Sequence, residues 1–69
     1  MYADPEDLKY ANTLGYTHTR GIQNGSRFEK EDRHIWSTWN GWQTADLVGH
    51  RYMHHKMFDH LRSALGRPL

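Results

Sequence analysis

The chain has 69 residues, a formal net charge of +1 and no cysteine. This length allows one small domain over residues 1–69, and the composition excludes disulfides and thiolate metal sites. The weak charge argues against a polybasic nucleic-acid-binding protein. Apolar runs fall short of the roughly 18–20 residues that span a bilayer, and no signal segment is recognisable. We therefore expect a protein without membrane contact, in the cytoplasm of a bacterial or phage-infected cell.

The first predicted element is an amphipathic helix that begins near Asp4. Asp4 is suited to the cap position, Pro5 to the first helical position, and the acids that follow favour the positive end of a helix dipole. The apolar stripe of this helix consists of Leu8, Ala11, Leu14, Gly15, His18 and Ile22. Gly15 lies on this stripe, where we expect it to make room for an aromatic ring of another element.

Residues 21–25 are predicted to form a turn between two helices. Asn24 and Gly25 both accept positive φ, and neither flank alternates as a strand would. Ser26 and Glu29 have the spacing of a capping box, which predicts the start of a second helix.

The predicted second helix carries all three tryptophans. At 100° per residue, one broad face contains Phe28, Ile35, Trp36, Trp39 and Trp42. The helix is expected to reach about Leu65, either continuous or kinked near Gly41 or Gly49, and to stop at residues 66–68. The predicted fold is therefore all-α, a helical hairpin with a long second helix. The predicted structural core is Leu8, Ala11, Leu14, Gly15, Ile35, Trp36, Trp39 and Trp42.

The shorter helix can cover only about half of the long apolar stripe. The uncovered half needs a partner, which is either a second copy of the chain or the target. We expect a homodimer, and the predicted self-association residues are Met53, Met57, Phe58, Leu61 and Leu65.

Six histidines suggest a metal site, but the pattern is incomplete. His50 and His54 would lie one helical turn apart, as metal ligands do, yet Arg51 stands where the zinc-protease pattern needs glutamate. We therefore expect no metal and no other cofactor. Catalysis has equally little support, since His55 and Asp59 are a single possible pair without a nucleophile setting or a glycine-rich phosphate loop.

Amphipathic aromatic and basic residues predict a partner-binding surface, because protein interfaces are enriched in such side chains. The predicted partner-binding residues are Tyr16, Arg20, Arg27, Arg33, Arg51, Tyr52, Lys56 and Arg62. The tryptophans can alternatively stack on bases while Arg27, Arg33 and Arg51 reach phosphates, although burial in the core is the favoured interpretation.

Residues 8–45 resemble the ribosome modulation factor family. The resemblance lies in Ala11, the pair Gly15-Tyr16, the glycines Gly21 and Gly25, Trp39, the pair Gly41-Trp42, and Ala45. It implies a two-helix fold that binds the small ribosomal subunit and silences translation.

Three functions remain open at this stage. The first is a non-enzymatic regulator that docks on a macromolecular partner, with the ribosome or its RNA implied by the resemblance. The second is a phage-encoded inhibitor that blocks a host protein, and the third is a metal-dependent helical assembly that uses His50 and His54. Binding to phosphates should weaken steeply as salt rises, whereas an apolar protein interface should not.

Overall fold

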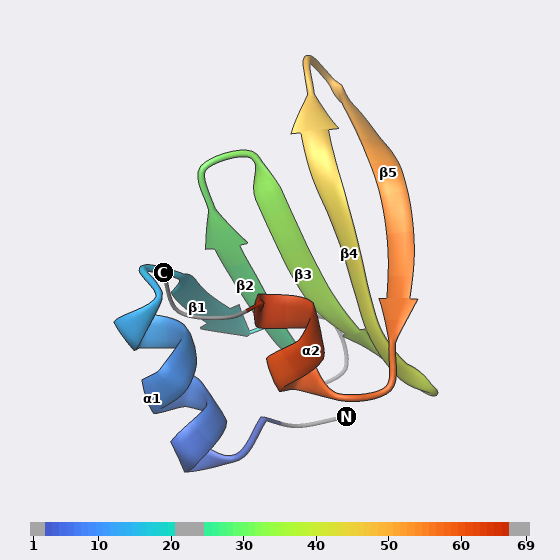
Figure 1. Cartoon of the computed structure of the whole chain (residues 1–69). Coiled ribbons are helices and arrows are strands. Elements are labelled where there is room, and N and C mark those ends of the chain that lie inside the picture. The colour runs from blue at the N-terminus through green and yellow to red at the C-terminus, as the bar shows by residue number, and fades with distance from the viewer. Residues whose placement is uncertain (1–2, 21–24, 67–69) are drawn as a thin grey trace.

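The protein is a two-layer structure in which two helices pack on one face of an antiparallel sheet. The computed structural model describes residues 3–20 and 25–66. The elements in chain order are α1 (Pro5–Thr13), β1 (Thr17–Arg20), β2 (Ser26–Lys30), β3 (Arg33–Thr38), β4 (Gly41–Val48), β5 (Arg51–Phe58) and α2 (Leu61–Leu65). The strands form a sheet in the order β1-β2-β3-β4-β5, and both helices lie in front of it in Figure 1. Within the described residues, no helix combines the length and apolar character needed to cross a membrane.

The all-α helical hairpin, whether predicted from the apolar stripe or implied by the resemblance, is therefore wrong. The first helix does begin at Pro5, with Asp4 at its cap position, but it ends at Thr13 instead of near Ile22. Gly15 has a φ of +91°, a conformation that turns the chain into β1 and that residues with a Cβ rarely adopt. The predicted second helix is replaced by β2, β3, β4, β5 and the five-residue α2.

Short turns join the strands from β2 to β5 and fix their register. Phe28 lies opposite Ile35, and Ile35 lies opposite Thr44. At the start of β4, a Cβ on Gly41 would stand 2.5 Å from the backbone oxygen of Phe58, so only glycine fits there without displacing the backbone. The β4–β5 hairpin extends beyond both helices in Figure 1.

The pairing of β4 with β5 contains a β-bulge. Thr44 pairs with Lys56 and Asp46 pairs with Met53, so two steps along β4 match three steps along β5. The extra residue lies on β5, where His54 adopts a φ of +60°. The extra residue shifts the alternation of side chains along β5 by one position. Two residues at an odd spacing across the bulge therefore face the same side of the sheet.

The core lies between the helices and one face of the sheet. The buried apolar residues that form it are Ala3, Ala11, Tyr16, Phe28, Ile35, Trp42, Leu61, Ala64 and Leu65. Buried and half-buried donors hold α2 against the rest of the chain: the Tyr16 hydroxyl donates to the Leu65 carbonyl over 3.1 Å, and the Arg33 guanidinium donates to the Ala64 carbonyl over 2.6 Å.

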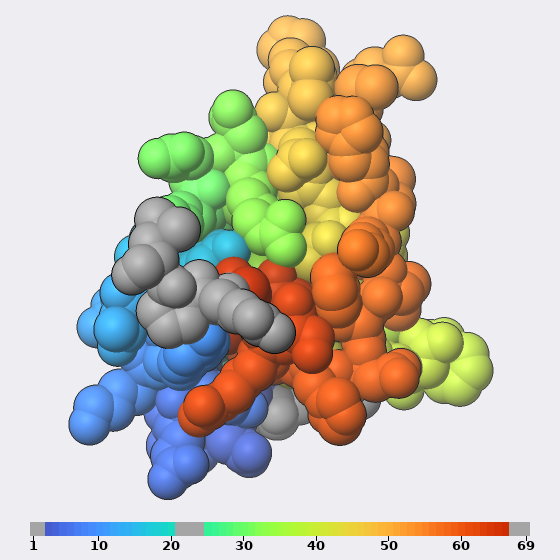
Figure 2. Space-filling view, in the orientation of Figure 1, coloured from blue at the N-terminus to red at the C-terminus, as the bar shows by residue number. Residues whose placement is uncertain are grey.

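The predicted core is only partly the observed one. Ala11, Ile35 and Trp42 are buried, and Leu8 and Leu14 are partly buried against the core. Gly15 lies at the exposed turn after α1. The helical stripe predicted to hold Trp36 and Trp39 does not exist. Trp36 is half-buried on the opposite face of the sheet, and Trp39 is 91% exposed in the β3–β4 turn, which projects from the body in Figure 2.

The predicted self-association stripe is likewise dispersed. Leu61 and Leu65 are on the buried side of α2, and Phe58 is half-buried beside the core. Met53 and Met57 are exposed, but their partners Asp46 and Gln43 are three residues apart on β4 and so face opposite sides of the sheet. These five residues therefore do not form one surface.

Candidate functional site

The face of the sheet that points away from the helices carries a connected group of polar and aromatic side chains. The register places Arg27, Trp36, Gln43 and Met57 in one row across β2 to β5, and Glu29 beside His34 in the next. We name this surface the open face, and its members are Arg27, Glu29, His34, Trp36, Gln43, Tyr52, His55 and Met57. Both helices lie on the other side (Figure 1), so no described helix covers it.

Arg27 is the centre of the hydrogen bonds on the open face. Its Nε donates to Glu29 Oε1 over 3.1 Å, and its Nη2 donates to the Tyr52 hydroxyl over 2.7 Å. The same Nη2 lies 3.1 Å from Nδ1 of His34. A guanidinium can only donate, so this Nδ1 accepts, and the proton of a neutral imidazole is on Nε2. Nδ1 of His34 also lies 3.6 Å from Oε1 of Glu29.

The hydrogen bonds around Arg27 stabilise the positive charge of its guanidinium. Burial lowers the pKa of its guanidinium, but the hydrogen bonds to Glu29 and Tyr52 outweigh that effect and leave the pKa above its ordinary value. The guanidinium carbon lies 5.7 Å from the ring centre of Trp36 and 5.9 Å from that of Tyr52. Arg27 is thus held between two aromatic rings by hydrogen bonds and cation–π contacts.

Aromatic contacts extend this arrangement to β5. The ring of Trp36 lies 5.6 Å from that of Tyr52 and 6.4 Å from that of His55, both in edge-on geometry. Tyr52 and His55 are three residues apart and would face opposite sides in a regular strand. The bulge at His54 brings both to the open face. Gln43 completes the group through a 2.8 Å hydrogen bond to Nδ1 of His55.

The open face combines a balanced charge with accessible apolar and aromatic surface. The one formal positive charge, Arg27, is balanced by Glu29 at 3.1 Å. Tyr52 is 41% and Met57 48% exposed, so apolar and aromatic surface is accessible. Tryptophan, tyrosine, methionine and arginine are the residues enriched at protein interfaces.

Of the residues predicted to bind a partner, only Arg27 and Tyr52 meet on the open face. Tyr16 is buried in the core, and Arg33 is engaged by Ala64 on the helix side. The remaining four are exposed but dispersed: Arg20, Arg51, Lys56 and Arg62. The sequence pattern did not predict a binding role for Glu29, His34, Gln43 or His55, and it predicted other roles for Trp36 and Met57. The missed signal is the alternation along β2, where Ser26 and Phe28 are buried and Arg27 and Glu29 are not.

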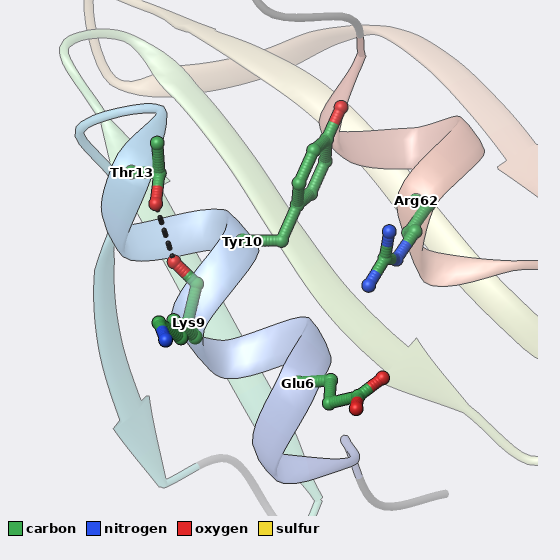
Figure 3. A pocket seen from close by; sticks show the side chains of 5 residues that line it. All are labelled: Glu6, Lys9, Tyr10, Thr13 and Arg62. Carbon is green, nitrogen blue, oxygen red and sulfur yellow. Dashed lines mark hydrogen bonds between the residues drawn. The ribbon is translucent and has the colours of Figure 1, made fainter.

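A surface groove between α1 and α2 is a second candidate, shown in Figure 3. It encloses about 350 Å³ and is lined by Glu6, Lys9, Tyr10, Thr13 and Arg62. The Arg62 guanidinium lies 4.8 Å from the ring centre of Tyr10 and donates to Asp7 over 2.9 Å, a bond that raises the pKa of Arg62. The Tyr10 hydroxyl donates to the Gly66 carbonyl. These groups hold α1 against α2, which is a structural role.

The histidines considered as metal ligands are separated by the fold. His50 lies in the β4–β5 turn, while His54 occupies the bulge with its Nδ1 3.2 Å from Asp46 Oδ2. In residues 3–20 and 25–66, no three His, Asp or Glu side chains are grouped so that they could hold a metal ion.

Comparisons with protein-family models, curated proteins and solved structures found no match to this chain. The resemblance to the ribosome modulation factor family therefore stays a prediction, and the function is argued from the geometry of the open face.

Proposed function

We propose that this chain is a non-enzymatic binding protein that docks on a protein partner through the open face. One observation carries the proposal: Arg27, Trp36 and Tyr52 form a connected, partly exposed cluster on the side of the sheet that the described helices leave bare. The interface residues whose truncation causes large losses of affinity are enriched in tryptophan, tyrosine and arginine.

The cluster is also held in place before any partner arrives. Arg27 is fixed by hydrogen bonds to three neighbours, and Trp36 is in contact with rings from β5. Side chains that are already ordered lose less conformational entropy on binding, so more of the contact energy contributes to affinity.

Charge favours a protein over a nucleic acid as the partner. A phosphate backbone needs several unpaired cations along a track, because affinity comes largely from counterion release. The open face offers Arg27 alone, and Glu29 neutralises it. Glu31 and Asp32 in the adjoining β2–β3 turn add negative charge at the rim. A protein surface with apolar side chains and hydrogen-bond acceptors is the better complement.

The proposal is tested by affinity capture from the source cells with matched tryptophan variants. Trp36→Ser removes the aromatic centre of the open face, whereas Trp39→Ser removes an equal ring from the exposed β3–β4 turn. Far-UV circular dichroism first verifies that both variants fold. We expect wild type and Trp39→Ser to retain the same protein at low and moderate salt, and Trp36→Ser to retain at least tenfold less.

Two outcomes would contradict the proposal. Equal retention by both variants would place the interface elsewhere. Ribosomal subunits that are captured at low salt and lost at moderate salt would instead favour the ribosome docking that the family resemblance implies.

A further inference from the structure

The outer edge of β5 is a second surface, distinct from the open face. Among residues 3–20 and 25–66, β5 is the last strand of the sheet and pairs only with β4. No described element runs alongside its outer edge in Figure 1. In an antiparallel edge strand, alternate residues direct their N–H and C=O groups outward, where nothing in the sheet pairs with them. Such an edge can accept an extended segment as an additional strand.

The side chains of β5 are unusually exposed and carry one sign of charge. Seven of its eight residues are exposed, and only Phe58 is half-buried. The strand reads Arg-Tyr-Met-His-His-Lys-Met-Phe, with Arg51 and Lys56 as formal cations, two histidines and no acid. The nearest carboxylate across the ladder, Asp46, is engaged by His54 at 3.2 Å.

This charge decides which extended segment fits. Two copies of β5 placed edge to edge would bring four formal positive charges together, and Lys on an edge strand is a common device against such pairing. An acidic segment would instead place carboxylates near Arg51 and Lys56. Lys56 Nζ lies 5.2 Å from the ring centre of Phe58. The charge of Lys56 is therefore held beside Phe58, in the part of β5 that pairs regularly with β4.

The bulge limits where a segment can pair. His54 has a φ of +60° and interrupts the edge, which leaves residues 55–58 on one side of the bulge and residues 51–53 on the other. A strand added beside residues 55–58 would continue the sheet next to Met57, which is 48% exposed.

We propose that the outer edge of β5 binds an extended acidic peptide segment, which joins the sheet as a sixth strand. The backbone edge supplies hydrogen bonds, and Arg51 and Lys56 select for negative charge. This surface does not depend on the docking role of the open face.

The test uses a synthetic peptide as long as β5 with alternating glutamate and valine, followed by NMR of the ¹⁵N-labelled chain. A peptide with lysine in place of glutamate has the same alternation and the opposite charge. We expect the glutamate peptide to shift the amide signals of residues 55–58 and to slow their hydrogen exchange, and to leave α1 unchanged. The lysine peptide should bind at least tenfold more weakly.

Charge-reversal variants provide the second measurement. Arg51→Glu with Lys56→Glu should weaken binding of the glutamate peptide at least tenfold. Lys9→Glu with Arg20→Glu changes the net charge equally on exposed positions of α1 and β1 and should retain wild-type affinity. Trp36→Ser should also retain it, which separates this proposal from the role of the open face.

The proposal is overturned by any of four results. These are no binding at millimolar peptide, equal binding of the two peptides, equal losses in the two charge-reversal variants, and shifts confined to residues outside β5. Concentration-dependent shifts of β5 without peptide would also overturn it, because they would assign the edge to a second copy of the chain.

Discussion

Replacing Trp42 with alanine, beside the same change at Trp39, tests the two-layer fold directly. Trp42 is 3% exposed, and its ring centre lies 6.1 Å from that of Phe28 within the core. Trp39 is 91% exposed in the β3–β4 turn. A helical stripe would bury both residues, whereas the sheet buries one and exposes the other.

The expected losses in the free energy of unfolding differ enough between the two variants to distinguish the sheet from the helical stripe. A buried aromatic removes about 150–250 Å² from water, which corresponds to about 4–6 kcal/mol at ~25 cal/mol per Å². Measured Trp→Ala changes in cores cost about 3–5 kcal/mol. At roughly 0.05–0.15 kcal/mol per residue, a chain of 69 residues has a free energy of unfolding of about 3–10 kcal/mol. Trp42→Ala should therefore remove most of the stability, while Trp39→Ala should change it by less than about 0.5 kcal/mol.

The assay is urea unfolding followed by far-UV circular dichroism, because tryptophan fluorescence itself changes in these variants. A Trp39→Ala variant whose free energy of unfolding fell by about 3 kcal/mol or more would contradict the two-layer fold. A Trp42→Ala variant with a wild-type urea midpoint would refute it equally.

Three further changes probe a turn, the core and the open face. Gly41→Ala places a Cβ 2.5 Å from a backbone oxygen and should lower the free energy of unfolding in urea by about 2–4 kcal/mol. Gly49→Ala, at a φ of +65° with open space around it, should lower it by only about 1–2 kcal/mol. Equal losses in the two variants would contradict the close approach at Gly41. Tyr16→Phe removes the buried bond to Leu65 and should cost about 1–3 kcal/mol by the same assay, because the carbonyl loses its side-chain donor. Arg27→Lys keeps the charge but not the fork that contacts Glu29 on the same strand, His34 on β3 and Tyr52 on β5. Partner capture should therefore fall at least tenfold while the urea midpoint changes little, and undiminished capture would exclude a specific role for the guanidinium.

The start of the first helix was predictable because its signals are local. Pro5 suits the first helical position through its fixed φ, and α1 begins there with Asp4 at the cap position, although the Asp4 side chain makes no capping hydrogen bond. The end of the helix depends on Gly15, whose φ of +91° turns the chain into β1. A glycine inside an apolar periodicity can lie within a helix or follow its end, so the position of the turn was not predictable from the pattern.

The prediction of a second helix was wrong because a spacing of seven residues fits both a helix face and a hairpin. Phe28 and Ile35 fall on one side of a helix at this spacing. They also lie directly opposite each other in a hairpin whose turn occupies residues 31–32. Ser26 and Glu29 show a similar ambiguity, since the spacing of a capping box also suits a strand that buries Ser26 and turns Glu29 to the other face. Only pairing between distant residues decides between these structures, and such pairing is not visible in a local pattern.

The candidate site was less predictable than the core for the same reason. Arg27 and Tyr52 were both expected at a partner-binding surface, and their side chains lie 2.7 Å apart although 25 positions separate them. Their meeting depends on the β-bulge, which aims Tyr52 and His55 at one face. A bulge of this kind leaves no periodic signal in the sequence.

The conformation of His54 provides a test of that bulge. A residue with a Cβ at a φ of +60° is strained by about 1–2 kcal/mol, and glycine is not. His54→Gly also loses the contact with Asp46, but that pair is largely exposed and contributes about 0–1 kcal/mol. We therefore expect His54→Gly to equal or exceed wild-type stability by up to about 1 kcal/mol, and His54→Val, with its branched Cβ, to fall about 1–2 kcal/mol below it. Urea unfolding measures this difference, and near-UV circular dichroism reports whether Trp36 and Tyr52 still pack together. If valine stabilised position 54 more than glycine, the strand would be regular there, and Tyr52 and His55 could not share the open face.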